Sequence, residues 1–150
     1  MIKMVYYLKI LKFTQGEIMG LFLSFDSQEK RRTYGGSAFI EIQFCKLPAD
    51  TKLKKILAVN SIVHWQNDSI YVYVDDIDAF SQNYCRILDC GMYNNKKSGI
   101  VDIYGINYYM PIMIDRIIEK LYQEEPLDYE VFINWLNKAK EYNGFYILGI

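Results

Sequence analysis

The sequence contains few of the residues from which catalytic and metal-binding sites are most often built. Its 150 residues include one histidine and three cysteines. A zinc finger or a multi-histidine metal centre needs more ligands of these two types than the chain holds. No specific catalytic motif is present either. We therefore expect a protein that has no metal, no cofactor and no enzymatic activity.

The cysteine count also bears on the compartment. Cys45, Cys85 and Cys90 are odd in number, whereas a secreted domain of this size more often carries an even set in a disulfide framework. The first residues lack the apolar stretch and cleavage site of a signal peptide. The longest apolar runs, such as residues 19–25, are far shorter than the roughly 20 residues of a membrane span. We expect a cytoplasmic protein with reduced thiols and no membrane contact.

A strong excess of charge of one sign is absent as well. The net charge is −1, which argues against a dedicated nucleic-acid binder. The charge is nevertheless uneven, because residues 1–74 carry 10 Lys/Arg against 6 Asp/Glu, and residues 75–150 carry 7 against 12. Much of the acidic excess lies in Asp115, Glu119, Glu124, Glu125, Asp128 and Glu130. These residues form either ordinary solvated helix faces or an acidic surface that steers a basic partner.

Tyrosine, in contrast, is plentiful. The chain has 14 tyrosines, 51% apolar residues and 23% charged residues, a composition typical of a folded globular protein. Tyrosine is enriched at protein–protein interfaces, where its ring is buried and its hydroxyl stays wet. A coding bias that raises Tyr, Ile, Asn and Lys together would give the same excess, so both explanations stay open.

Alternating apolar and polar residues predict several strands. Residues 37–45 predict a half-buried strand with Glu41 and Gln43 on its solvent face. Residues 61–66 and 69–74 flank the turn pair Asn67-Asp68 and predict a hairpin, in which His64 and Tyr71 lie opposite each other on one face. Residues 4–13 and 17–26 predict a second hairpin, and residues 27–36 predict a loop.

Helical periodicity predicts four helices. Asp50 is the expected N-cap of a short helix that includes Leu53, Ile56 and Leu57. The other three helices are expected at about 77–89, at 111–124 with Pro111 in the first turn, and after an N-cap at Asp128. Residues 99–109 predict a strand or a bent pair, and the apolar tail 145–150 predicts an inner strand buried on both faces.

This order of elements predicts one α+β domain that covers residues 1–150. Hairpin strands alternate irregularly with helices, which favours a mainly antiparallel or mixed sheet packed with about four helices. No internal repeat and no linker divides the chain.

His64 and a group of aspartates are the two candidates for chemistry. His64 could act as a general base with Cys85 or Asp75 in a shared pocket, or it could be a half-buried strand histidine without a catalytic role. Asp75, Asp76 and Asp78 lie between a strand and a helix. They are expected to cap the helix or to bind a partner, two roles that are compatible, while a divalent-cation site is a further alternative.

The end of the chain carries a family resemblance. It consists of an amphipathic helix with Trp135, Leu136 and Ala139, then Glu-Tyr-Asn-Gly at 141–144, then the apolar strand 145–150. A small, partly acidic α+β domain with this ending resembles the immunity proteins of contact-dependent growth inhibition and related polymorphic toxin systems. The resemblance implies a bacterial protein that binds one cognate toxin domain, often a nuclease, and blocks its active site or substrate groove. An acidic surface would suit a basic nuclease.

We expect the partner-binding residues to form two patches. The first patch contains Asp75, Asp76 and Asp78 together with Tyr71 and Tyr73. The second patch contains Glu124, Glu125 and Asp128. The alternative is a non-enzymatic adaptor or a structural homodimer that associates through the Tyr/His face of the predicted hairpin.

Overall fold

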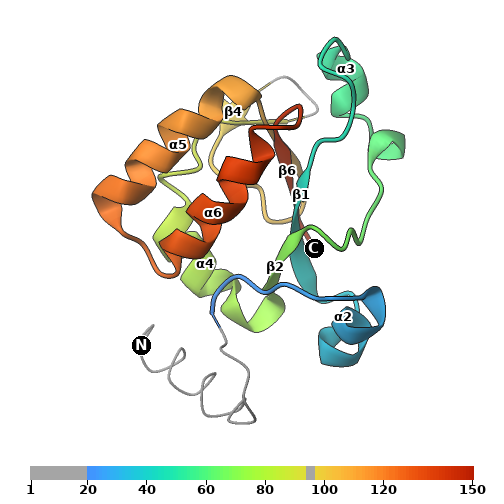
Figure 1. Cartoon of the computed structure of the whole chain (residues 1–150), viewed down its shortest axis with the longest axis vertical. Coiled ribbons are helices and arrows are strands. Elements are labelled where there is room, and N and C mark those ends of the chain that lie inside the picture. The colour runs from blue at the N-terminus through green and yellow to red at the C-terminus, as the bar shows by residue number, and fades with distance from the viewer. Residues whose placement is uncertain (1–19, 94–96) are drawn as a thin grey trace.

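The computed structural model describes residues 20–93 and 97–150, and within them the chain forms five α-helices and a six-stranded sheet (Figure 1). The helices are α2 (Gln28–Gly35), α3 (Leu53–Ile56), α4 (Ile77–Tyr84), α5 (Pro111–Glu124) and α6 (Tyr129–Ala139). The strands are β1 (Phe39–Phe44), β2 (Ile70–Tyr73), β3 (Gly91–Met92), β4 (Ser98–Gly99), β5 (Ile106–Tyr109) and β6 (Phe145–Leu148). The predicted strand over 4–13 and the first residues of the strand over 17–26 lie outside this part of the chain.

All pairs of neighbouring strands are antiparallel, in the order β2-β1-β6-β5-β3-β4. The C-terminal strand β6 lies between β1 and β5, and all four of its residues are buried. The predicted inner strand at the tail is therefore confirmed, as is the α+β class with an antiparallel sheet. Among the helices of the described residues, none is both long enough and apolar enough to cross a membrane.

Helices α4, α5 and α6 cover one face of the sheet and enclose the main core (Figure 1). Aromatic rings make its tightest contacts, with Phe44 of β1 stacked on Trp135 of α6 at 4.3 Å between centroids. Helix α5 begins and ends as the sequence predicts, because Pro111 occupies its first turn and its apolar stripe is buried. Helix α4 is shorter than predicted and ends at Tyr84. Helix α3 is a single turn whose N-cap is Lys52, so the expected cap at Asp50 is wrong.

The second face of the sheet is also covered, contrary to the sequence prediction. All six residues of β1 are buried, including Glu41 and Gln43, which were expected to face solvent. Helix α2, helix α3 and the segment 57–69 lie over this face (Figure 1). The predicted loop over 27–36 is wrong because these residues form α2, in which the Ser27 hydroxyl accepts the N–H of Lys30 at the N-cap.

The predicted hairpin around Asn67-Asp68 does not form. Residues 62–69 contain no strand, and β2 pairs with β1 instead. On its other edge β2 meets Leu23, whose N–H and carbonyl both bond to the backbone of Tyr71 at 2.8 Å. Tyr71 is consequently buried in the second face of the sheet, while His64 is exposed. The Tyr/His face expected for a homodimer is therefore not present.

Alanine substitutions at two glycines test how closely the residue before β6 packs against β5. Gly144 is the test position and Gly36 is the control. Both have positive φ, at 78° and 61°. A Cβ on Gly144 would collide with the carbonyl oxygen of Tyr109, whereas a Cβ on Gly36 would meet nothing within 4 Å. We expect Gly36→Ala to cost about 1–2 kcal/mol of unfolding free energy through the backbone alone. Gly144→Ala should cost about 2–4 kcal/mol, because steric overlap adds to the backbone cost. Urea unfolding measures both, and equal losses would contradict the packing described here.

Candidate functional site

The connection between α5 and α6 carries the second acidic patch that the sequence predicts. Helix α5 ends at Glu124, and Glu125 follows in a left-handed C-cap with φ 45°, its N–H bonded to the carbonyl of Leu121 at 2.9 Å. Pro126 then stops the helix. Asp128 occupies the N-cap position of α6, also with positive φ, at 63°. Two left-handed residues thus reverse the chain within four positions.

Neighbouring elements hold this turn. The Asn83 side-chain oxygen accepts the N–H of Leu127 at 3.0 Å, and the Tyr84 hydroxyl donates to the carbonyl of Leu127 at 2.7 Å. The predicted N-cap position of Asp128 is confirmed, but its side chain accepts the backbone N–H of Phe22 at 3.1 Å and makes no cap bond to α6. Burial and the carboxylate of Asp128 raise the pKa of Tyr84 far above the ordinary value for tyrosine. The turn is therefore part of the packed structure.

We call the surface formed by Tyr122, Glu124, Glu125, Tyr129 and Glu130 the acidic corner. Its three glutamates are exposed, and Tyr122 is 62% exposed. Within the described part of the chain, none of these glutamates forms an ion pair. Partial burial, together with Glu125 and Glu130, raises the pKa of Tyr129. Tyr129 thus lies close enough to two of these carboxylates to be influenced by their charge.

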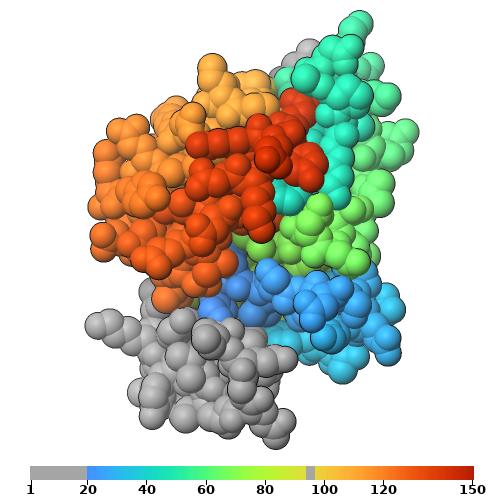
Figure 2. All heavy atoms as spheres, viewed as in Figure 1, coloured from blue at the N-terminus to red at the C-terminus, as the bar shows by residue number. Residues whose placement is uncertain are grey.

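The charge balance along the sequence agrees with this arrangement. Residues 121–137 contain four acidic residues and no lysine or arginine. The nearest lysines in sequence that form ion pairs do so elsewhere, Lys120 with Asp89 at 3.4 Å and Lys140 with Asp115 at 2.8 Å. The atoms of α5 and α6 form a broad, continuous part of the molecular surface (Figure 2). Tyr122 and the three glutamates are exposed, so the corner is accessible and bears net negative charge.

The first predicted patch is not assembled as expected. Asp75 and Asp78 are exposed at the start of α4, but Asp76 is buried at its N-cap without a side-chain cap bond. Tyr71 is 0% exposed, and Tyr73 is half-buried. Only the two exposed aspartates remain available to a partner on this side. Within residues 20–93 and 97–150, no group of three His, Cys, Asp or Glu residues could hold a metal ion.

A buried carboxylate, which the sequence analysis missed, organises the second face of the sheet. Glu41 is 1% exposed, and its oxygens accept the N–H groups of Trp65 and Gln66, both at 2.8 Å, and the hydroxyl of Ser69 at 2.7 Å. The available signal was Phe39, an apolar residue on the face of β1 that the alternation assigned to solvent. A large apolar side chain there indicates a covered face.

Aromatic and cationic groups complete this cluster. The guanidinium carbon of the buried Arg31 lies 4.0 Å from the centre of the Trp65 ring, a cation–π geometry. The Tyr71 hydroxyl donates to the carbonyl of Gln66 at 2.6 Å. Burial and the carboxylate of Glu41 raise the pKa of Tyr71 to about 12. These groups satisfy one another, so the cluster serves to fix the segment 62–69.

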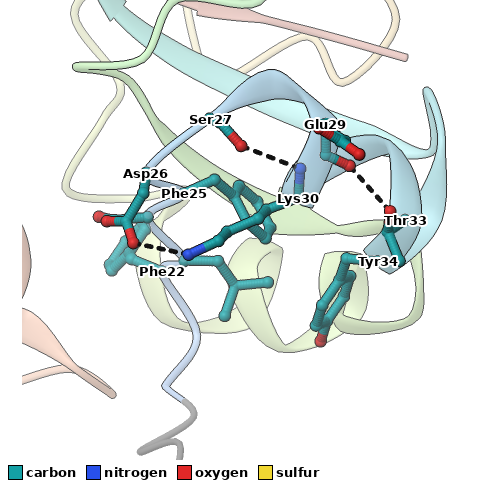
Figure 3. A pocket seen from close by; sticks show the side chains of 10 residues that line it. Phe22, Phe25, Asp26, Ser27, Glu29, Lys30, Thr33 and Tyr34 are labelled. Carbon is teal, nitrogen blue, oxygen red and sulfur yellow. Dashed lines mark hydrogen bonds and ion pairs between the residues drawn. The ribbon is translucent and has the colours of Figure 1, made fainter.

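His64 lies beside this cluster. Its Nδ1 is 3.8 Å from a Glu41 oxygen, and its side chain is half exposed. A hollow of about 890 Å³ lies beside α2 and is lined by residues between Phe22 and Tyr34, which include the Lys30–Asp26 ion pair of 2.9 Å (Figure 3). A smaller hollow of about 400 Å³ lies beside Cys45. Neither hollow is lined by His64, Asp75 or Cys85, the residues that the enzyme alternative would bring together.

Comparison of the chain with protein-family models, with curated proteins and with solved structures finds no match.

Replacing the buried carboxylate tests its structural role. In Glu41→Gln the new amide NH₂ would point at one of the two backbone N–H groups that now donate to the carboxylate, so two donors would face each other. We expect a loss of about 2–4 kcal/mol of unfolding free energy. Ser69→Ala removes one donor and leaves the other two in place, so it should cost only about 1–2 kcal/mol. Urea unfolding of both variants measures the difference, and a Glu41→Gln protein as stable as wild type would refute the role of the carboxylate.

The raised pKa of Tyr71 predicts a loss of stability in alkali. The pKa is about 10 in an unfolded chain and about 12 in the folded protein. The stabilisation from the neutral hydroxyl is therefore complete below about pH 10 and is lost as the pH rises through 12. After allowance for solvent screening, we expect Tyr71 to contribute about 1–2 kcal/mol to this loss.

Unfolding free energies measured between pH 9 and about pH 11.5 test this prediction. Tyr71→Phe should show a smaller decline than wild type, whereas the control Tyr104→Phe, at a tyrosine that is 77% exposed, should follow the wild-type curve. A decline in Tyr71→Phe as steep as in wild type would contradict the assignment.

Proposed function

We propose that this protein is an immunity protein that acts in the cytoplasm of a bacterium by binding a cognate toxin domain. The partner that suits its surface best is a basic nuclease, whose active site or substrate groove it would block. The observation that carries the proposal is the acidic corner, in which three glutamates and Tyr122 are exposed in a stretch without lysine or arginine.

Charge complementarity supports a nuclease as the partner. A nuclease binds the phosphate backbone of its substrate through lysine and arginine side chains. Carboxylates that approach this groove meet the charge that attracts phosphate, and they raise the association rate by about 10- to 1,000-fold at low salt. Glu124, Glu125 and Glu130 would supply this steering.

Steering alone does not give a stable complex, because exposed ion pairs contribute only about 0.2–1 kcal/mol each. Aromatic side chains that become buried at the centre of an interface contribute more. Tyr122 is already largely exposed, and Val131 is exposed on the first turn of α6. We expect these two side chains to provide the apolar contact area of the complex, with the glutamates around them.

Charge reversal of the corner tests the proposal. A candidate partner is sought as a basic domain encoded in the reading frames beside this protein. It is expressed together with the protein, and co-purification is measured together with the association rate. Glu124→Lys/Glu125→Lys should slow association about tenfold or more and should weaken its dependence on salt. Protection of cells that express the toxin should fall in parallel.

The matched control is Asp50→Lys/Glu141→Lys, which changes the net charge equally at two exposed residues. Asp50 precedes α3 by three residues, and α3 lies at the end of the molecule away from the α5–α6 turn (Figure 1). Asp75→Lys/Asp78→Lys tests the remainder of the first patch in the same assay. If the control slows association as much as the corner variant does, the corner is not the contact surface. Failure of the wild-type protein to bind the toxin domain would refute the immunity function.

A further inference from the structure

The α5–α6 turn has a backbone conformation that its own sequence does not favour. Glu125 and Asp128 both have positive φ, a conformation that aspartate tolerates but that is uncommon for glutamate. A four-residue connection of this kind keeps one shape only if surrounding elements hold it. The position of the glutamates in the acidic corner therefore depends on contacts from outside the turn.

Helix α4 supplies those contacts at Leu127. Asn83 accepts its N–H at 3.0 Å, and the Tyr84 hydroxyl donates to its carbonyl at 2.7 Å, so both backbone polar groups of this residue are satisfied by one helix. The Asn83 side chain is itself fixed, because its NH₂ donates to the carbonyl of Ala79 at 2.8 Å.

The Tyr84 ring is fixed as well. It stacks on Phe80 at 5.5 Å between centroids, and it meets Phe22 and Phe132 edge to face at 5.1 Å and 5.6 Å. Tyr84 is completely buried. A buried, tightly packed ring gives its hydroxyl little freedom, so the hydrogen bond to the turn is rigidly placed.

We infer that Asn83 and Tyr84 are positioning residues, which hold the acidic corner in its partner-binding shape before the partner arrives. This inference rests on the proposed function of the corner. A surface that is already ordered loses little conformational freedom on binding, so more of the contact free energy appears as affinity. Neither residue contacts the partner, and both act through the backbone of Leu127.

Tyr84→Phe and Tyr108→Phe form a matched pair for the test. Each removes a buried hydroxyl that donates to a backbone carbonyl at 2.7 Å, to Leu127 in the first case and to Asn143 in the second. Both variants should fold and should show similar shifts of the urea midpoint. Only Tyr84→Phe should increase amide hydrogen exchange at Leu127 and Tyr129, by about tenfold, because only it releases the turn.

A short polylysine peptide serves as the cationic probe, with amide chemical shifts of residues 122–130 as the readout. Tyr84→Phe should raise the dissociation constant about fivefold relative to Tyr108→Phe and should leave the salt dependence unchanged, since every carboxylate remains. Glu124→Lys/Glu125→Lys should instead reduce the salt dependence.

The outcomes separate the inference from the function on which it rests. If polylysine changes the amide chemical shifts of residues 122–130 but binds both tyrosine variants equally, the positioning role of Asn83 and Tyr84 is wrong, while the acidic corner remains the proposed binding surface. Unchanged amide exchange in Tyr84→Phe would overturn the positioning role in the same way. If polylysine leaves residues 122–130 unaffected in the wild-type protein, the proposed surface fails and the inference fails with it.

Discussion

The carboxylate of Glu41 determines how the chain covers the second face of its sheet. A buried charge is stable only when hydrogen bonds replace its water, and here two backbone N–H groups and a hydroxyl from residues 65–69 do so. Those bonds turn the segment away from strand pairing and bring Trp65 beneath the guanidinium of Arg31, which ties α2 to the same cluster. Helix α2, the segment 62–69 and strand β1 are therefore linked through one side chain.

The sequence predicted the elements whose signals are local. Helix α5 has a proline at its start and a continuous apolar stripe, and the tail is apolar without interruption, so both were predicted with correct bounds or location. Helix α2 has only Arg31 buried and thus shows no apolar stripe for periodicity to detect. The predicted hairpin around Asn67-Asp68 does not form for a different reason. The backbone N–H groups of Trp65 and Gln66, which would have paired with β2, donate instead to Glu41, more than 20 residues away in sequence. No alternation of residue types records such a contact.

Charge predicted where the candidate surface lies, but it did not predict which of the acidic residues are exposed and which are buried or hydrogen-bonded. Acidic residues around a proline between two helices indicate an exposed turn, and Glu124 and Glu125 are exposed. Asp128 belongs to the same run, yet its carboxylate binds the N–H of Phe22, a residue distant in sequence. Asp76 and Tyr71 were expected at the surface and are buried, since their surroundings are set by the packing of β2 and α4. Charge predicts where a surface lies, and tertiary contacts decide which of its residues a partner can reach.

The backbone bonds between Leu23 and Tyr71 bear on how copies of the protein behave at high concentration. An outer strand with free backbone groups is a template on which another chain can add a strand and start an aggregate. At one end of the sheet Leu23 occupies part of that template on β2, and at the other end the outermost strand in the described residues, β4, is only two residues long. Strand exchange between molecules therefore has little to begin on at either end. A high concentration of the protein therefore carries a lower risk of self-association through added strands.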